Sequence, residues 1–321
     1  MSSPAGRLHD EGGLHKQHGR LREAEAALRA ALALAPDNAK TRHALGIVLL
    51  SQGRYAEGWP LYDARHQVPE LGLLKPGLPY PEWRGEPLAG KRLLIFPEQG
   101  FGDQIMFARF APLLRDRGAK VTLICNLLLA RLFEGLGVEV IAASGAVEFA
   151  DPDYWVMSGS VAGRAVAGPQ EVPAEPYLFA TPSAPGGGVG VVTQGNPKHA
   201  NDANRSLFGR DAERLLALPS ARSLALADTG AQDFADTAAI VAGLDLVVTV
   251  DTSVAHLAGA MGKPVWILIP SLMTDWRWME GRTDSPWYPT ARLYRQARPG
   301  DWSEVLDRVE RDAAIFSATG R

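Results

Sequence analysis

This chain of 321 residues has one cysteine, no long apolar run and no excess of positive charge. The one cysteine, Cys125, excludes an internal disulfide and a thiolate metal cluster, and it favours a reducing compartment. No stretch approaches the roughly 18–20 apolar residues that a membrane-spanning helix needs. A net charge of −3 gives no support for a surface that binds nucleic acid or acidic membranes. The opening MSSPAGRLHDEGG lacks the apolar segment of a secretory signal, so we expect a cytoplasmic protein.

Composition and length fit a soluble globular protein with more than one domain. Apolar residues make up 46% of the chain and charged residues 21%, which allows buried cores of ordinary size. A chain of this length has room for two domains and a small additional segment.

The first 68 residues contain an internal repeat. GRLRE (19–23) aligns with GRYAE (53–57), an offset of 53 − 19 = 34 residues, and Gly12 and Gly46 keep the same offset. This is the period of tetratricopeptide repeats, in which each unit is a pair of helices. We therefore predict about two units over residues 1–68, with the first helix of the first unit poorly formed. Two stacked units alone have marginal stability, so we expect them to pack against the rest of the chain. Their role is either that of a structural cap or that of a docking surface for a peptide.

After a proline- and glycine-rich linker at 69–90, strand-like and helical segments alternate, which predicts parallel sheets with crossover helices. PSAPGGG (182–188) interrupts the pattern and is by composition a flexible hinge. It separates two α/β halves, at 91–181 and 189–321. Ligands of open parallel sheets bind at the carboxyl ends of the strands, so the expected site is a cleft between the halves. The expected strands are 91–96, 119–125, 138–143, 189–194, 223–227, 245–250 and 264–270, and the expected helices are 104–118, 127–137, 211–219, 236–244, 253–262 and 302–316.

A glycine-rich stretch, EQGFGDQ (98–104), follows the first strand of the first half. Glycine permits unusual backbone angles and lets a ligand approach the main chain closely. Asp103 stands where a helix is expected to begin, so it either caps that helix or faces the cleft. The stretch does not have the spacing G-x-G-x-x-G, and a dinucleotide fingerprint is therefore excluded.

The second half carries a sharper signal, VTVDTSVAHLAGAMG (248–262). A buried strand is expected to end at Asp251, and Thr252 and Ser253 open the next helix. Free amides and the helix dipole at such an end attract an anion. His256 lies one turn further along, where it could donate to the same anion or be a core histidine.

A polar loop, TQGNPKHANDANRS (193–206), should reach the same edge of the sheet. Lys198 and Arg205 could hold a diphosphate there, although surface loops are often polar for no other reason than exposure. Further hydrogen-bonding groups of this loop are Gln194, Asn196 and His199.

The segment DWRWMEGRTDSPWYP (275–289) interleaves aromatic rings with Arg277 and Arg282. Such rings either stack on a base or a sugar, or pin a long loop over a cleft. The motifs G-x-S-x-G, H-E-x-x-H and G-x-x-x-x-G-K-[ST] are absent from the sequence, which argues against serine hydrolases, zinc proteases and P-loop proteins.

Four blocks, in this order, resemble bacterial tetratricopeptide proteins that carry a glycosyltransferase domain of the heptosyltransferase-like (family 9-like) kind. The blocks are EQGFGDQIMFARFAPLL, GNPKHANDANRS, DFADTAAIVAGLDLVVTVDTSVAHLAGAMGKPVW and DWRW…DSPWYP…LYRQ, and the likeness covers roughly residues 10–315. It implies a GT-B-like α/β fold, a pair of Rossmann-like domains preceded here by a short all-α tetratricopeptide segment. It also implies that the second domain binds the donor, with no catalytic metal and no cofactor beyond the nucleotide sugar as co-substrate.

The resemblance implies roles for individual residues. Asp103 matches the acid that heptosyltransferases are thought to use as general base. Asp251, Thr252 and His256 match the block D-T-x-x-x-H, which cradles the diphosphate of the donor. The donor-binding set is then Gln194, Asn196, Lys198, His199, Arg205, Asp251, Thr252, Ser253 and His256, and the sugar-side loop is Gln99, Gly100, Gly102 and Gln104.

The implied function is a metal-independent, inverting transfer of a sugar from a nucleotide sugar to an acceptor hydroxyl. Some relatives are implicated in glycosylating flagellin, so we expect a protein acceptor docked by the repeats, and neither a nucleic-acid nor a membrane partner. The chain departs from the family at Gln194, where a tryptophan is usual, and at Ala225, where a glutamine is common. Two other functions stay open, a non-catalytic adaptor with a degenerate transferase domain and a sugar-nucleotide epimerase.

Overall fold

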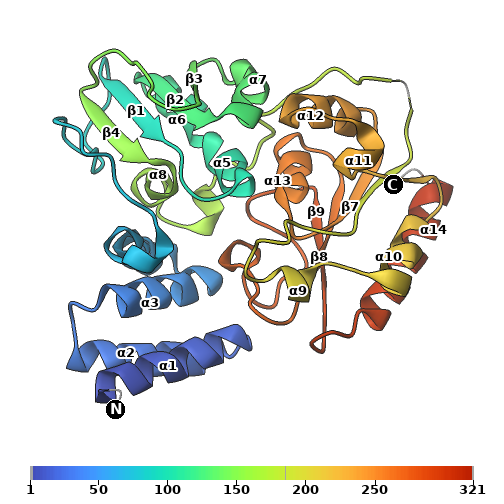
Figure 1. The fold of residues 1–321 in the computed structure, drawn as a ribbon, viewed down its shortest axis with the longest axis horizontal. Coiled ribbons are helices and arrows are strands. Elements are labelled where there is room, and N and C mark those ends of the chain that lie inside the picture. Colours follow the sequence, from blue (N-terminus) through green and yellow to red (C-terminus); the bar gives the residue numbers. More distant parts are fainter. Residues whose placement is uncertain (1–2, 185, 320–321) are drawn as a thin grey trace.

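The computed structural model describes residues 3–184 and 186–319. Residue 185, inside the predicted hinge 182–188, lies outside the described residues, as do 1–2 and 320–321 at the ends of the predicted segments 1–68 and 189–321. Figure 1 shows a helical segment (blue) below the first half (cyan to green) in this view, with the second half (yellow to red) beside both.

The helical segment consists of two helix pairs. Its elements are α1 (Pro4–Gln17), α2 (Leu21–Leu34), α3 (Ala39–Ser51) and α4 (Tyr55–Tyr62), followed by the 3-10 turns η1 (Asp63–Gln67) and η2 (Pro69–Leu71). The repeated glycines occupy equivalent places in the two pairs. A Cβ at Gly12 in α1 would lie 2.6 Å from Leu28 Cγ in α2, and one at Gly46 in α3 would lie 2.6 Å from the backbone N of Tyr62 in α4.

The prediction of a poorly formed first helix is wrong. Helix α1 runs for 14 residues, with Ser3 accepting a hydrogen bond from Gly6 N at its start and Pro4 at its first position. Gly12 weakens the intrinsic helix propensity of this segment, but it is the residue on which α2 packs. Contact between the helices therefore outweighs local propensity.

Each half contains one wholly parallel sheet. In the first half the strands are β1 (Arg92–Phe96), β2 (Lys120–Asn126), β3 (Glu139–Ala143) and β4 (Tyr154–Met157), in the order β3-β2-β1-β4. Its helices are α5 (Phe101–Ala108), α6 (Phe110–Asp116), α7 (Ala130–Phe133) and α8 (Ser158–Ala165).

In the second half the strand order is β6-β5-β7-β8-β9. The strands are β5 (Val189–Val192), β6 (Ala221–Ser223), β7 (Leu246–Val250), β8 (Val265–Ile269) and β9 (Ala291–Arg295). The helices are α9 (Asp202–Arg205), α10 (Gly209–Leu216), α11 (Leu226–Thr229), α12 (Phe234–Ala242), α13 (Ser253–Ala260) and α14 (Ser303–Thr319), with the 3-10 turn η6 (Trp276–Trp278). Two parallel α/β halves behind a helical segment confirm the predicted fold class.

Three predicted elements differ from the observed ones. The helix expected at 104–118 is two helices, α5 and α6, which meet at Arg109. The buried Arg109 guanidinium donates to the carbonyl oxygens of Pro173 and Trp287, a contact that only the folded chain creates. The helix expected at 127–137 is mostly 3-10 turns around the four-residue α7, and the strand expected at 223–227 ends at Ser223, before α11.

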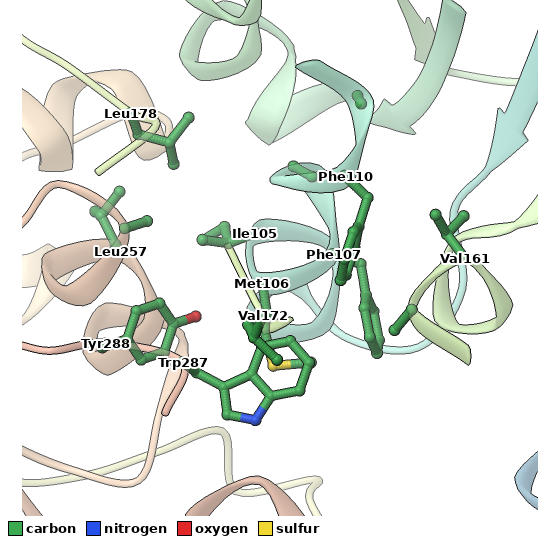
Figure 2. Packing of buried hydrophobic residues seen from close by; sticks show 14 of the residues in the cluster. Ile105, Met106, Phe107, Phe110, Val161, Val172, Leu178, Leu257, Trp287 and Tyr288 are labelled. Atoms are coloured by element: carbon green, nitrogen blue, oxygen red, sulfur yellow. The ribbon is translucent and has the colours of Figure 1, made fainter. Parts of the chain in front are cut away.

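One apolar core joins all three parts of the protein. It contains Tyr55 and Trp59 from α4, Phe107 from α5, and Leu257 and Trp287 from the second half. Figure 2 shows the part of this cluster in which α5 faces the residues of the second half. Helix α14 packs on the second sheet through a separate cluster with Trp266 and Leu306. No helix within 3–184 or 186–319 is both long and apolar enough to cross a membrane.

Candidate functional site

The amino ends of α5 and α13 meet between the two halves. Each helix follows the carboxyl end of a central strand, β1 in the first sheet and β7 in the second. Their close approach depends on Gly102, because a Cβ there would lie 2.7 Å from His256 Cδ2 and 3.5 Å from Ser253 Cα. A cavity of about 490 Å³ opens beside this contact.

The cavity gathers residues that are far apart in the sequence. The predicted site residues that line it are Gln99, Gly100, Gly102, Asp103, Gln104, Asn196, Lys198, His199, Arg205, Asp251, Thr252, Ser253 and His256. Gln194 is exposed and is not among the lining residues. The cavity is also lined by residues that were not among the predicted site residues, namely Phe101, Asn126, Asn201, Met273, Asp275 and Arg277.

Asp103 stands at the third position of α5 rather than at its cap. Gly100 is the N-cap residue, and its backbone N donates to Asp103 Oδ2 at 2.9 Å. The other oxygen, Oδ1, forms an ion pair with the guanidinium of Arg277. The Asp103 side chain remains 19% exposed and lines the cavity. Burial raises the pKa of Asp103 above its ordinary value, and the Arg277 cation offsets this only in part.

Arg277 brings positive charge from the second half to the loop of the first half. It lies in η6 and is 5% exposed, with Nη1 donating to Asp275 Oδ2 at 2.7 Å. Its guanidinium lies 4.7 Å from the centre of the Trp276 ring. The sequence already marked this residue in DWRW (275–278), where an arginine lies between two tryptophans and follows an acid. What the sequence did not show was its partner, Asp103.

The start of α13 presents backbone amides that no side chain of the described residues caps. Thr252 is the N-cap residue, but its side chain makes no capping hydrogen bond and instead lies 3.2 Å from Thr249 Oγ1. The Thr252 side chain therefore leaves the first amides of this helix without a side-chain acceptor. Burial, reinforced by the carboxylate of Asp275, raises the pKa of Asp251 to about 7. A partly protonated Asp251 repels a negatively charged ligand at this helix start less than a fully ionised Asp251 would.

His256 is a buried histidine with a hydrogen-bond partner, and it also lines the cavity. Its Nδ1 lies 2.9 Å from the hydroxyl of Tyr288, and its ring stacks on Trp278 at a centroid distance of 5.2 Å. Burial, reinforced by the Arg277 cation, lowers the pKa of His256 to about 3. The imidazole is therefore neutral near pH 7. When the Tyr288 hydroxyl donates to Nδ1, the proton of the ring is on Nε2.

The polar loop before β6 contributes two kinds of cation. The Arg205 guanidinium is buried and donates to the backbone oxygen of Asp251 at 2.7 Å, so it supports the end of β7. Lys198 is exposed at the cavity, and within the described residues its side chain makes no ion pair. Lys198 is thus the more available of the two for a ligand.

The aromatic residues of 275–289 do not form a stacking platform. Trp276, Trp278, Trp287 and Tyr288 are all buried, which supports the interpretation that they pin the loop. Arg282 pairs with Asp284 at the surface, away from the cavity lining. Over residues 3–184 and 186–319, no group of three or more His, Cys, Asp or Glu side chains is arranged to hold a metal ion.

Two protein families match this chain, one in the helical segment and one in the second half. The tetratricopeptide repeat family matches residues 16–58, which cover the helices around Gly46. Glycosyltransferase family 9 (heptosyltransferase) matches residues 211–268, the stretch that contains β7 and the start of α13. Each match covers less than half of the chain and shows similarity to the family over that stretch. The cavity residues Asp251, Thr252, Ser253 and His256 lie within the stretch that matches glycosyltransferase family 9.

Protein FlbA of Caulobacter vibrioides is 29% identical over 354 residues, covering 93% of this chain and 59% of FlbA. The chain thus spans about three-fifths of the length of this curated relative. Among solved structures, the glycosyl transferase family 9 from Veillonella parvula is 10% identical, with 74% of this chain and 92% of that one covered and a TM-score of 0.44. The heptosyltransferase WaaC of E. coli, solved with ADP, is 13% identical, with 71% and 98% covered and a TM-score of 0.41.

Proposed function

We propose that this chain is an inverting glycosyltransferase that moves a sugar from a nucleotide-sugar donor to an acceptor hydroxyl without a catalytic metal. One observation carries the proposal. The Asp103 carboxylate from one half and the uncapped start of α13 from the other border the same cavity. The first suits a proton acceptor and the second a diphosphate.

In the proposed reaction, the acceptor oxygen attacks the anomeric carbon of the sugar from the face opposite the nucleotide. Asp103 takes the proton of the acceptor hydroxyl as the new bond from carbon to oxygen forms. The bond from the anomeric carbon to the phosphate oxygen breaks, and its electron pair leaves with the nucleoside diphosphate. The raised pKa of Asp103 favours this role, since a carboxylate with a higher pKa is a stronger base.

The leaving group would bind at the start of α13. The amides there, the hydroxyl of Ser253 and the ammonium of Lys198 would stabilise the negative charge that develops on the diphosphate. His256 would add one hydrogen bond without adding charge, because its imidazole is neutral. Asn196, His199 and Arg205 complete the proposed donor side, and Gln99, Gly100, Gly102 and Gln104 the proposed sugar side.

We place the acceptor on a protein, with flagellin as the finer prediction, and the reaction in the cytoplasm. The tetratricopeptide match supports a protein partner. A lone buried cysteine fits a reducing compartment.

Thermal unfolding against UDP, GDP, ADP, CMP and matching nucleotide sugars tests this function. A ligand at 100 times its dissociation constant adds about 2.7 kcal/mol, which raises the unfolding temperature by several degrees at this size. The substitution Ser253→Asp should abolish the shift, because it adds negative charge where the diphosphate would bind. The matched control Ser303→Asp, at the start of α14 and outside the cavity, should retain it.

The outcomes separate the alternatives. A shift with one nucleotide that Ser253→Asp removes supports the donor site and identifies its nucleotide. No shift with any nucleotide favours the non-catalytic adaptor. Conversion of the free nucleotide sugar to its epimer without an acceptor favours the epimerase.

A further inference from the structure

We propose that the tetratricopeptide segment is a working part of the transfer site, in which Tyr62 and Arg65 position the loop that carries Asp103. The inference rests on the proposed function and goes beyond it, since it assigns the repeats a role apart from docking. Both residues belong to the end of the helical segment, Tyr62 to α4 and Arg65 to η1. Neither lines the cavity, so both would act through the loop.

Arg65 anchors the beginning of the loop. Its side chain is fully buried, and it binds the carboxylate of Glu98 through two bonds, from Nη2 to Oε1 at 2.6 Å and from Nε to Oε2 at 2.9 Å. A two-pronged contact of this kind fixes the orientation of the carboxylate as well as its place. Glu98 also accepts a hydrogen bond from the backbone N of Gly159, at the start of α8. Glu98, the first residue of EQGFGDQ, is thus a joint between the repeats and the first half.

Tyr62 holds the next residue. The Gln99 amide Nε2 donates to the Tyr62 hydroxyl at 2.8 Å, and the Tyr62 ring is 2% exposed. Gln99 has a φ of +62°, a backbone conformation that residues other than glycine rarely adopt. Such a conformation persists only where surrounding contacts hold it, and the bond to Tyr62 is one of these contacts. Burial raises the pKa of Tyr62 to about 12, so the hydroxyl is neutral at physiological pH.

The same helix also holds the other partner of the Asp103–Arg277 ion pair. Trp59 in α4 packs edge-on against Trp276, with ring centroids 5.2 Å apart, and Tyr62 lies 6.0 Å from the same ring. Trp276 directly precedes Arg277. Helix α4 therefore contacts the loop that bears the carboxylate and the loop that bears the guanidinium.

This arrangement couples the repeats to the transfer site. Reacting groups must be held to within a fraction of an ångström for a productive geometry, and small displacements cost rate. A displacement of α4 would move the backbone of Gln99 and, through it, the start of α5. Tyr62 and Arg65 are positioning residues in this sense, and they touch neither donor nor acceptor.

The test compares two conservative changes in the same helix. Tyr62→Phe removes the hydroxyl that holds Gln99, whereas Tyr55→Phe removes a buried hydroxyl that accepts from Trp287 Nε1 at 3.0 Å. Hydrogen–deuterium exchange of the peptide that spans 98–104 is measured first, on the full chain without ligand. Loss of one hydrogen bond should speed exchange of this loop by about 2- to 10-fold in Tyr62→Phe and leave it unchanged in Tyr55→Phe.

Turnover is measured next, with the nucleotide sugar identified by thermal unfolding. Tyr62→Phe should lower kcat by about 2- to 10-fold and leave the dissociation constant of the nucleotide unchanged, and Tyr55→Phe should alter neither. The variant Gln99→Met removes the same bond from the other side. Its effect on exchange should not add to that of Tyr62→Phe in the double variant.

Equal exchange of the loop in Tyr62→Phe and the parent, or equal acceleration in both tyrosine variants, would overturn the inference. Because exchange is measured without a donor, it can succeed while transfer fails. Faster exchange without any detectable transfer would count against the proposed function alone. Faster exchange with unchanged kcat would overturn the positioning role.

Discussion

The carboxylate of Asp103, in the first half, forms an ion pair with the guanidinium of Arg277, in the second half. The two residues are 174 positions apart, and the pair lines the cavity at the point where the halves meet. Asp275 shares the same guanidinium through a bond of 2.7 Å. The proposed base therefore carries a counter-ion that belongs to the domain proposed to bind the donor.

Asp103→Asn should abolish transfer and spare nucleotide binding. The amide cannot accept the proton, so kcat should fall by about 10²- to 10⁴-fold, the range typical of a lost general base. Steady-state kinetics and nucleotide titration measure the two effects. Asp116→Asn, an exposed position of the same half that pairs with Arg115, is the control and should behave like the parent. Full turnover in Asp103→Asn would exclude Asp103 as the base.

Arg277→Gln should shift the pH dependence of transfer. The Arg277 cation lowers the pKa of Asp103, so its removal should raise that pKa further. The base must be ionised to act, and the acidic limb of the pH–rate profile should therefore move to higher pH. Breaking a buried ion pair should also lower the free energy of unfolding, by at most about 3 kcal/mol. Solvent screening reduces this loss, because the Asp103 side chain is 19% exposed.

Two further variants check that assignment. Arg282→Gln removes a surface partner of Asp284 and should leave both the profile and the stability nearly unchanged. The double variant Arg277→Gln/Asp103→Asn should be less destabilised than the sum of the single changes, since only Asp275, and no longer Asp103, is left as a carboxylate without its cation. An acidic limb that stays in place in Arg277→Gln would contradict the coupling.

Asp251→Asn should change how stability depends on pH. The pKa of Asp251 is raised to about 7 in the native protein, from an ordinary value of 3.8. Its contribution to stability is therefore fully present below about pH 4 and is lost as the pH rises through 7. The variant lacks this loss, so its free energy of unfolding relative to the parent should increase from pH 4.5 to pH 8. A pKa raised from 3.8 to about 7 sets an upper bound of about 4 kcal/mol on this increase.

Urea denaturation at several pH values measures that difference. His256, whose pKa is lowered to about 3, acts in the opposite direction and destabilises the native protein as the pH falls below about 6.5. That contribution is common to parent and variant and cancels in the comparison. Parallel stability curves would show that the pKa of Asp251 is not raised in the native protein.

Gly102→Ala should destabilise the contact between the halves. The added methyl group would lie 2.7 Å from His256 Cδ2, so α5 and α13 must separate, at a cost of about 1–3 kcal/mol. Chemical denaturation measures the loss, and nucleotide affinity should fall with it. Gly13→Ala is the matched control, because nothing lies within 4 Å of its added atom and the helical position favours alanine. A Gly102→Ala variant as stable as the parent would mean that the two helices have room to move.

Much of the site could be predicted because it depends on local order in the chain. Strands alternating with helices predict parallel sheets, and the carboxyl ends of parallel strands share an edge. The residues after β1 and β7 were therefore expected near one another, and the structure places Gly102 against His256. The repeat was visible for a similar reason, since equivalent contacts in the two helix pairs require a small residue at Gly12 and at Gly46.

The remaining features depend on contacts between distant segments, which no local pattern encodes. The sequence by itself determined the α/β pattern, the repeat and the set of polar residues at the sheet edge, because periodicity and helix starts are local. Only the tertiary structure decided that α1 is a complete helix, that Arg109 interrupts the helix expected at 104–118, and that Glu98 faces Arg65 rather than the cavity. It also decided the partner of Asp103, since a buried charge takes its counter-ion from whichever segment packs against it, here Arg277.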